Sequence, residues 1–336
     1  MNKLKQRVLF IGPRTFGYEY EIKHELERAG YNVDWYDERP SSGPLVKSLL
    51  RIWPEIVGIK SNKYYDGIIR HAKKVHYDVV FIIKGEALSL ERLYKLRDTL
   101  PDSRFIFYTW DSLKNFKNSQ EKIPCFDKAY SFDVHDTEMN SGIVHLPLFY
   151  TCSYEWLGDL IEDADIVADI DLLFLGSIHT DRYRAIKKIF SESSKVLDDL
   201  NIYSHFYFQS RWVFALRKLV NKEFRKIPLL DVKWNALDKV ETFSLIGSSK
   251  ILIDVQHVNQ TGLTMRTIEC IGAKKKLITT NVEVKNYDFY DPQNILVIDR
   301  ENPVITKEFL MTPYQPLEEK IYRKYSLREW LRQILS

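Results

Sequence analysis

Short apolar runs alternate with segments of helical periodicity along the first part of the chain. The runs RVLFIG (7–12), DVVFIIKG (78–85) and SRFIFYTWDS (103–112) are nearly continuous in apolar side chains, which is typical of strands buried on both faces of a parallel sheet. The segment YEYEIKHELERAG, which follows the first run, repeats its apolar positions with helical spacing and ends at Gly30. This alternation predicts a parallel sheet wrapped by helices over residues 1–150.

An acidic segment interrupts this pattern. The sequence CSYEWLGDLIEDADIVADID, which starts at Cys152, shows no clean period, and we interpret residues 151–170 as a linker. Strand and helix patterns then resume with DLLFLG and predict a second α/β domain over residues 171–315. The remaining residues, 316–336, contain LEEKIYRKYSLREWLRQIL, which predicts one final helix that could cross back to the first domain.

Two consecutive α/β units, each beginning with an apolar strand that ends in glycine, predict a fold of two Rossmann-like domains that face each other across a cleft. Open parallel sheets bind ligands beyond the carboxyl ends of their strands. We therefore look for chemistry in the loops that follow the predicted strands.

The chain has 336 residues, of which 45% are hydrophobic, and a formal net charge of +3. A core for two domains can form, whereas this charge is too small to indicate nucleic acid as a partner. The three cysteines are widely spaced, which suggests neither a disulfide framework nor a zinc site and favours a reducing cytosol. The first apolar run stops at Gly12, too early for a signal peptide, and no run is long enough to span a membrane. We expect a cytoplasmic location.

The stretch NQTGLTMRTIECIGAKKKLITTN (259–281) predicts a loop, a helix and a strand. If the helix runs from Thr264 to Ala273, then Gly262, Arg266 and Glu269 lie on the side opposite the face that packs on the sheet. The N–H groups of the loop from Asn259 to Gly262, at a helix N-terminus, favour a phosphate, and Arg266 could add a charged fork to it. Glu269 could accept hydrogen bonds from sugar hydroxyls. The structural alternative is an exposed Arg–Glu pair of small energetic effect.

This stretch resembles the donor-binding segment of GT-B glycosyltransferases, in which a loop with Glu and Gly leads into a helix whose glutamate binds the nucleotide ribose. Gly262 and Glu269 match that pattern, and Thr261 stands in place of its first glutamate. The arginine three residues before Glu269 makes the stretch more similar to a branch that includes CgeB-like spore maturation proteins and lipopolysaccharide and capsule sugar transferases. The resemblance extends from about Asp171 to Asn281. It implies a nucleotide-sugar donor in the second domain and an acceptor in the first.

A second candidate turn is LLFLGSIHTDRYRAI (172–186), where a strand, Gly176 and Ser177 lead into a helix near Thr180 or Asp181. Such a βα turn lets an anion approach the backbone closely, and in GT-B proteins the equivalent turn faces the donor. A glycine in an ordinary βα turn is the structural alternative. Two such turns in one domain, here and at residue 262, strengthen the prediction of a phosphate site.

Carboxylates follow two strands of the first domain. Asp111 comes at the end of FIFYTWDS, where it could act as the general base that deprotonates an acceptor hydroxyl, or could simply cap the following segment. The loop SFDVHD offers Asp133, His135 and Asp136, from which a His/Asp pair is conceivable, although a lone histidine is more often structural.

Two other signals are weak. The first turn, IGPRTFG, lacks a dinucleotide fingerprint, and we interpret it as a tight surface turn, with Arg14 as a possible contact for an acidic acceptor. Asp163 and Asp165 imitate an Asp-X-Asp metal motif but precede a strand rather than follow one, so we interpret them as solvated charge and expect no metal.

The segment SRWVFALRKLVNKEFRK (210–226) combines an apolar stripe with many Arg and Lys residues. A basic amphipathic helix can lie on an anionic membrane surface, which would give peripheral contact with the inner membrane. We favour the alternative in which the stripe packs inside a domain and the charges are solvated.

These observations predict a GT-B-like, metal-independent glycosyltransferase that moves a sugar from a nucleotide-sugar to a hydroxyl of a glycan or lipid-linked acceptor, in cell-surface polysaccharide or lipopolysaccharide synthesis. Asp111 would be the base, the loops at Gly176, Ser177, Asn259 and Gly262 with Arg266 would hold the phosphates, and Glu269 would hold the ribose. Two rivals remain open: a nucleotide-sugar epimerase, and a non-catalytic assembly protein that kept the fold.

Overall fold

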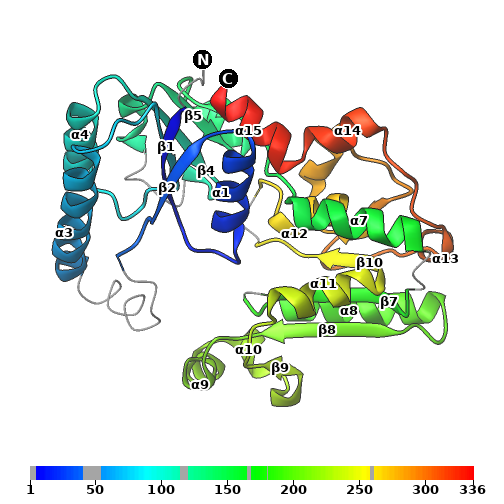
Figure 1. Cartoon of the computed structure of the whole chain (residues 1–336). Coiled ribbons are helices and arrows are strands. Elements are labelled where there is room, and N and C mark those ends of the chain that lie inside the picture. The colour runs from blue at the N-terminus through cyan, green and yellow to red at the C-terminus, as the bar shows by residue number, and fades with distance from the viewer. Residues whose placement is uncertain (1–4, 41–53, 114–119, 165–167, 180, 258–260) are drawn as a thin grey trace. The chain divides into compact units, whose positions relative to one another are not determined.

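The computed structural model describes residues 5–40, 54–113, 120–164, 168–179, 181–257 and 261–336. The chain divides into two compact units (Figure 1). Unit 1 consists of residues 1–147 and 327–336, and unit 2 of residues 148–326. Each unit contains one six-stranded sheet in which every neighbouring pair of strands is parallel. The predicted α/β fold with two Rossmann-like halves is confirmed.

The sheet of unit 1 has the strand order β2-β1-β3-β4-β5-β6. Because β1 pairs with both β2 and β3, the strand order reverses between β1 and β3. The strands are β1 (Arg7–Gly12), β2 (Asn32–Asp37), β3 (Val79–Ile83), β4 (Arg104–Thr109), β5 (Lys128–Ser131) and β6 (Val144–His145). The helices are α1 (Tyr18–Arg28), α3 (Pro54–Ala72), α4 (Leu90–Thr99), α6 (Val134–Met139) and α15 (Leu327–Leu335).

The two faces of this sheet are covered by different helices, with α3 and α4 on one face and α1 and α15 on the other (Figure 1). Strand residues alternate between the faces. On the side of α15, the ring of Trp330 lies 5.9 Å from that of Phe81 and 4.7 Å from that of Tyr108, measured between centroids. Trp330 is almost fully buried, so it anchors the end of the chain in the core of unit 1.

The predicted single final helix is wrong in one respect, because it is broken into α14 (Glu319–Lys324) and α15. At the break, the N–H of Tyr150 donates to the carbonyl of Tyr325 over 2.9 Å, and Tyr150 forms a parallel bridge with Ser326. This strand-like pairing with a distant residue stops the helix at residues 325 and 326.

The sheet of unit 2 has the order β12-β11-β10-β7-β8-β9, so the strand order reverses between β7 and β10. The strands are β7 (Ile170–Ser177), β8 (Ile202–Tyr207), β9 (Val232–Lys233), β10 (Ser249–Asp254), β11 (Lys276–Thr279) and β12 (Ile295–Val297). The other helices of this unit are α7 (Cys152–Ala164), α8 (Arg182–Val196), α9 (Arg211–Val220), α10 (Lys222–Arg225), α11 (Lys239–Gly247), α12 (Met265–Gly272) and α13 (Lys307–Met311).

The acidic segment that we expected to be a linker forms helix α7, which packs on α12 (Figure 1). The two helices meet where they have no side chains: a Cβ on Gly158 would lie 2.6 Å from the carbonyl oxygen of Gly272. A Cβ on Gly272 would in turn lie 2.6 Å from the ring of Tyr150. The helix contacts its unit through the buried side chains of Tyr154 and Leu157 and through Gly158. So few buried positions do not produce a clear helical repeat of apolar residues, and the sequence therefore suggested a linker.

Helix α9 also differs from expectation. We predicted that its apolar stripe packs inside the domain, but Phe214 is the buried residue of this helix and the stripe is exposed. None of the helices in the described part of the chain has the length and apolar character needed to cross a membrane.

Candidate functional site

The carboxyl ends of β7 and β10 lie side by side where the strand order of unit 2 reverses. Arg182, the first residue of α8, connects the two loops that follow these strands. Its Nε donates to the carbonyl of Val255 over 2.7 Å, and its Nη1 donates to the carbonyl of Ser177 over 3.2 Å. The predicted residues Gly176 and Ser177 therefore lie beside an arginine that sequence analysis did not single out.

Gly176 lies next to this guanidinium and has no side chain that would occupy the space beside it. A Cβ at that position would lie 2.9 Å from the ring of Phe174 and 3.4 Å from Nη1 of Arg182. The first distance is shorter than real Cβ contacts, so a side chain at this position of β7 would have to displace the ring of Phe174 beside the cation.

Arg182 has no direct carboxylate partner in the described part of the chain, although the charges of Asp254 and Asp181 act on it. Among the residues that the structure describes, it forms no ion pair within 4 Å, and its polar contacts are main-chain carbonyls. The nearby carboxylate of Asp254 accepts hydrogen bonds from the hydroxyls of Thr264 and Thr267, over 2.6 and 3.0 Å. Asp254 thus holds the start of α12 against the sheet.

Two pKa shifts describe the electrostatics at this edge. Burial lowers the pKa of Arg182 to about 10, while the charge of Asp254 opposes that shift and the charge of Arg300 adds to it. Burial also lowers the pKa of His179 to about 3, assisted by the positive charges of Arg182 and Arg300. An anion bound here would meet cations that are already desolvated and fixed, which favours phosphate or carboxylate ligands.

Arg300 ties a third loop to the same edge. It lies just after β12, and its Nη1 is 3.0 Å from Oδ1 of Asp181, while its Nη2 donates to the carbonyl of Gln256. The side chains of Gln256 and Thr280 in turn hydrogen-bond to each other. The loops after four neighbouring strands are therefore cross-linked.

The loop before α12 is held by Asn281, which sequence reasoning also missed. Its amide nitrogen donates to the carbonyls of Thr261 and Gly262, over 3.2 and 3.3 Å. Thr264 is the N-cap of α12, and its hydroxyl accepts from the N–H of Thr267. Gly262 is buried in this loop, whereas Asn259 lies outside the described residues.

Arg266 and Glu269 form an ion pair of 2.8 Å, but the pair is not the exposed one considered from the sequence. Their side chains are 20% and 8% exposed. Helix α7 packs on α12 and brings Tyr154 close to both. Burial, followed by the charge of Glu269, raises the pKa of Tyr154 well above its usual range. This side of α12 packs against α7, a helix that was not predicted from the sequence. The ribose-binding role of Glu269 stays a prediction.

In unit 1, Asp111 follows β4 and pairs with Lys84, which follows β3; Oδ2 and Nζ are 2.6 Å apart. Lys84 has a φ of 69°, a left-handed conformation that a non-glycine residue adopts at a cost of about 1–3 kcal/mol and that is enriched at functional sites. A buried carboxylate, Glu38, lies in the same cluster, where it accepts from the N–H of Glu86 over 2.8 Å. Burial raises the pKa of Glu38 to about 7.

Asp133 and Asp136, the other candidate carboxylates of unit 1, make contacts within the fold. Asp133 is the N-cap of α6, and its carboxylate accepts from the N–H of His135 over 3.1 Å. Asp136 accepts from the hydroxyl of Ser131 and the N–H of Leu113. His135 pairs with Glu138 on the surface, so the conceivable His/Asp pair is not formed. Arg14, considered as an acceptor contact, lies over the ring of Trp35.

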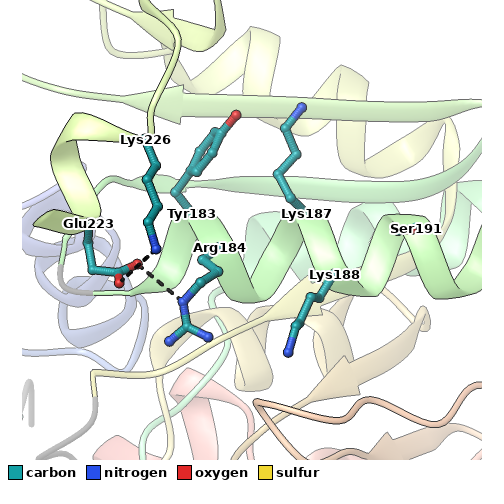
Figure 2. A pocket seen from close by; sticks show the side chains of 7 residues that line it. All are labelled: Tyr183, Arg184, Lys187, Lys188, Ser191, Glu223 and Lys226. Atoms are coloured by element: carbon teal, nitrogen blue, oxygen red, sulfur yellow. Dashed lines mark hydrogen bonds and ion pairs between the residues drawn. The ribbon is translucent and has the colours of Figure 1, made fainter.

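A cavity of about 290 Å³ lies between α8 and α10 (Figure 2). Its cations already have partners: Glu223 lies 3.2 Å from Arg184 and 3.9 Å from Lys226, and Lys187 lies 2.9 Å from Asp231. This cavity is therefore a weaker anion site than the edge at Arg182.

Within the described residues, no group of three or more His, Cys, Asp or Glu side chains is arranged to hold a metal ion. Of the Asp-X-Asp pair, Asp163 falls at the end of α7 and Asp165 lies outside the described residues.

No protein-family model matches this chain, and no curated protein matches its sequence. Solved structures do share its fold. A glycosyltransferase from Rickettsia africae ESF-5 is 15% identical, with a TM-score of 0.57 over 99% of this chain and 97% of that one. A UDP-forming α,α-trehalose-phosphate synthase from Burkholderia xenovorans, in complex with glucose-6-phosphate, is 10% identical, with a TM-score of 0.57 over 98% and 100%.

A UDP-GlcNAc 2-epimerase from Methanocaldococcus jannaschii, in complex with UDP-GlcNAc and UDP, is 12% identical, with a TM-score of 0.51 over 98% of this chain and 99% of that one. At such low identities the likeness shows the fold alone. The chain has the two-unit α/β fold of GT-B glycosyltransferases, a fold that this epimerase shares.

The buried Arg266–Glu269 pair leads to a stability prediction. Glu269→Ala should lower the free energy of unfolding by about 3 kcal/mol, because it leaves the Arg266 charge buried without its partner. Glu269→Gln, which keeps the shape and an acceptor, should cost less. Urea unfolding measures both. The matched control is Glu192→Ala, which removes an exposed pair with Lys195 on α8 and should cost less than about 0.5 kcal/mol. Equal costs for the two alanine variants would show that the Arg266–Glu269 pair is not buried in solution.

Proposed function

We propose that this protein is a glycosyltransferase that binds a nucleotide-sugar at the carboxyl edge of the unit 2 sheet and transfers the sugar to a hydroxyl of a glycan or lipid-linked acceptor. The observation that carries the proposal is Arg182, a desolvated cation that holds the loops after β7 and β10 where the strand order reverses. The fold shared with nucleotide-sugar enzymes supports it.

The leaving group explains why such a cation is needed. When the acceptor oxygen forms its bond to the anomeric carbon, the bond from that carbon to the β-phosphate oxygen breaks and the nucleoside diphosphate leaves with additional negative charge. Arg182, and Arg266 with the loops at Gly176, Ser177, Asn259 and Gly262, would stabilise that charge. In this proposal the arginines replace a metal ion, so binding should not require Mg²⁺.

The acceptor hydroxyl must lose a proton, and we assign this role to Asp111. Lys84 holds one oxygen of that carboxylate and orients it. Glu269 would hold the ribose of the donor, with Arg266 orienting its carboxylate. The CgeB-like branch and a role in cell-surface polysaccharide or lipopolysaccharide synthesis stay predictions.

Nucleotide binding is the first test. We expect one of UDP, GDP, CMP, ADP and dTDP to raise the melting temperature, with or without Mg²⁺, since a ligand at a hundred times its Kd stabilises a protein by about 2.7 kcal/mol. Arg182→Met should weaken binding roughly 10- to 100-fold in calorimetric titration, because it removes charge-assisted hydrogen bonds. Lys188→Met is the matched control, since Lys188 lies further along α8 and pairs with Glu301 instead. Unchanged affinity in a folded Arg182→Met variant would refute this site.

Product analysis separates the proposed function from its rivals. With the donor identified by binding, we expect transfer to an acceptor that Asp111→Asn reduces by at least about 100-fold without affecting nucleotide affinity. Asp127→Asn is a matched control, because Asp127 pairs with Arg97 near the opposite ends of the strands. Release of an epimerised nucleotide-sugar in the absence of acceptor would indicate an epimerase. Binding without turnover of any kind would indicate the non-catalytic protein.

A further inference from the structure

Helix α9 exposes its apolar face. Trp212 is 84% and Val220 83% exposed, and Leu216 and Leu219 are exposed as well. The 3₁₀ turn that follows α10 adds Leu229 and Leu230, of which Leu230 is 92% exposed. We call these six residues the α9 face. A cluster of this kind on a protein surface commonly marks an interaction site.

The orientation of α9 is fixed by its opposite side. The ring of Phe214 lies between 5.2 and 5.6 Å from those of Phe208, Phe224 and Trp234. Arg217 lies over the rings of Phe208 and Phe224, and Nζ of Lys218 donates to the carbonyl of Ile227. Since successive residues of a helix are about 100° apart, the apolar side chains of the α9 face fall in one arc opposite Phe214. The side chains of Arg217 and Lys218 therefore lie against the domain, and the apolar side chains of α9 point to the surface.

The segment that carries the α9 face is rich in positive charge. Residues 210–233 contain seven Lys or Arg and two Asp or Glu, a net charge of +5, so the rest of the chain carries −2 of the overall +3. Both acidic residues are engaged by α8, Glu223 with Arg184 and Asp231 with Lys187, as Figure 2 shows for Glu223. Lys222 and Lys226 are exposed on the segment between α9 and Leu229, and Lys226 also lies 3.9 Å from Glu223. A surface that is apolar at its centre and cationic at its rim complements anionic lipid headgroups above an acyl layer.

We propose that the α9 face docks the protein onto an anionic membrane surface, with Trp212, Leu216 and Val220 inserted at the level of the headgroups. A ten-residue helix is too short to cross the bilayer, and it would lie in the plane of the interface. A second copy of this chain is a poor occupant, because it would bring two segments of +5 charge together.

Helix α9 lies close along the chain to the strand end next to the candidate anion site. The helix begins four residues after β8 ends, and β8 runs parallel to β7, whose end carries Gly176 and Ser177. The α9 face and the candidate anion site thus follow neighbouring strand ends of one sheet. If the proposed function holds, a lipid-linked acceptor would already lie in the membrane to which the enzyme is docked.

Vesicle flotation of the full-length protein tests the proposal. We expect it to float with phosphatidylcholine vesicles that contain about 30 mol% phosphatidylglycerol, and to remain unbound with phosphatidylcholine alone. Leu216→Ser with Val220→Ser should weaken binding roughly tenfold or more. The matched control, Val304→Ser with Met311→Ser, changes two exposed apolar residues of the same unit and should bind as the wild type.

Charge is tested separately. Lys222→Gln and Lys226→Gln should each weaken vesicle binding by about fivefold, whereas Lys285→Gln and Lys307→Gln, at other exposed positions, should not. Trp212 fluorescence should shift to shorter wavelength with anionic vesicles, and Trp212→Phe should remove that shift.

Three results would overturn the proposal. The first is no flotation with anionic vesicles. The second is binding that Leu216→Ser with Val220→Ser leaves unchanged in a folded protein, which would be electrostatic adsorption only. The third is a dimer in sedimentation that this double variant dissociates, which would make a second copy the occupant. None of these results depends on nucleotide binding, so the proposed function can fail or stand independently.

Discussion

The contact between Arg182 and the main-chain carbonyls of Ser177 and Val255 is the interaction on which the candidate site depends. It joins the ends of two strands at the point where the strand order reverses, and it fixes a cation between them. The carbonyl groups orient the guanidinium but carry no net charge. A carboxylate in their place would cancel the charge of Arg182. Together with burial, the charges of Arg182 and Arg300 lower the pKa of His179. The site is thus preorganised for an anion before any ligand arrives.

A second constraint is the close contact of α7 with α12 at Gly158 and Gly272. It buries Arg266 and Glu269 under Tyr154. Glu269 is therefore both the residue that resembles a ribose-binding glutamate and a residue that packs between two helices. A substitution at Glu269 therefore changes stability as well as any ligand contact. A substitution at Arg182 separates ligand binding from stability better than one at Glu269, because Arg182 contacts loops and does not pack between helices.

The sequence predicted those parts of the fold that depend on local pattern. The apolar runs at β1, β3, β4 and β7 identified buried strands because both faces of a parallel sheet are covered. The same analysis found Gly176 and Ser177 at a strand end and Gly262 in the loop before a helix, and the structure places the first two beside Arg182. Their role in binding is still a prediction.

What the sequence did not reveal depends on partners that are distant along the chain. The carbonyl that Arg182 contacts lies 73 residues away. The break between α14 and α15 comes from pairing with Tyr150, and Lys84 becomes notable only because Asp111 lies beside it. The stripe of α9 has the same spacing whether it is packed or exposed. Only the aromatic cluster around Phe214 decides which way it faces.

The central claim is that a nucleotide binds at the carboxyl edge of the unit 2 sheet, and amide hydrogen exchange with and without the nucleotide that binds best tests it most directly. Exchange should slow in peptides that cover residues 176–182, 254–257 and 261–266, because ordered loops and new hydrogen bonds protect their amides. Protection confined to residues 184–191 and 222–226, around the cavity in Figure 2, would contradict the claim and move the anion site to that cavity.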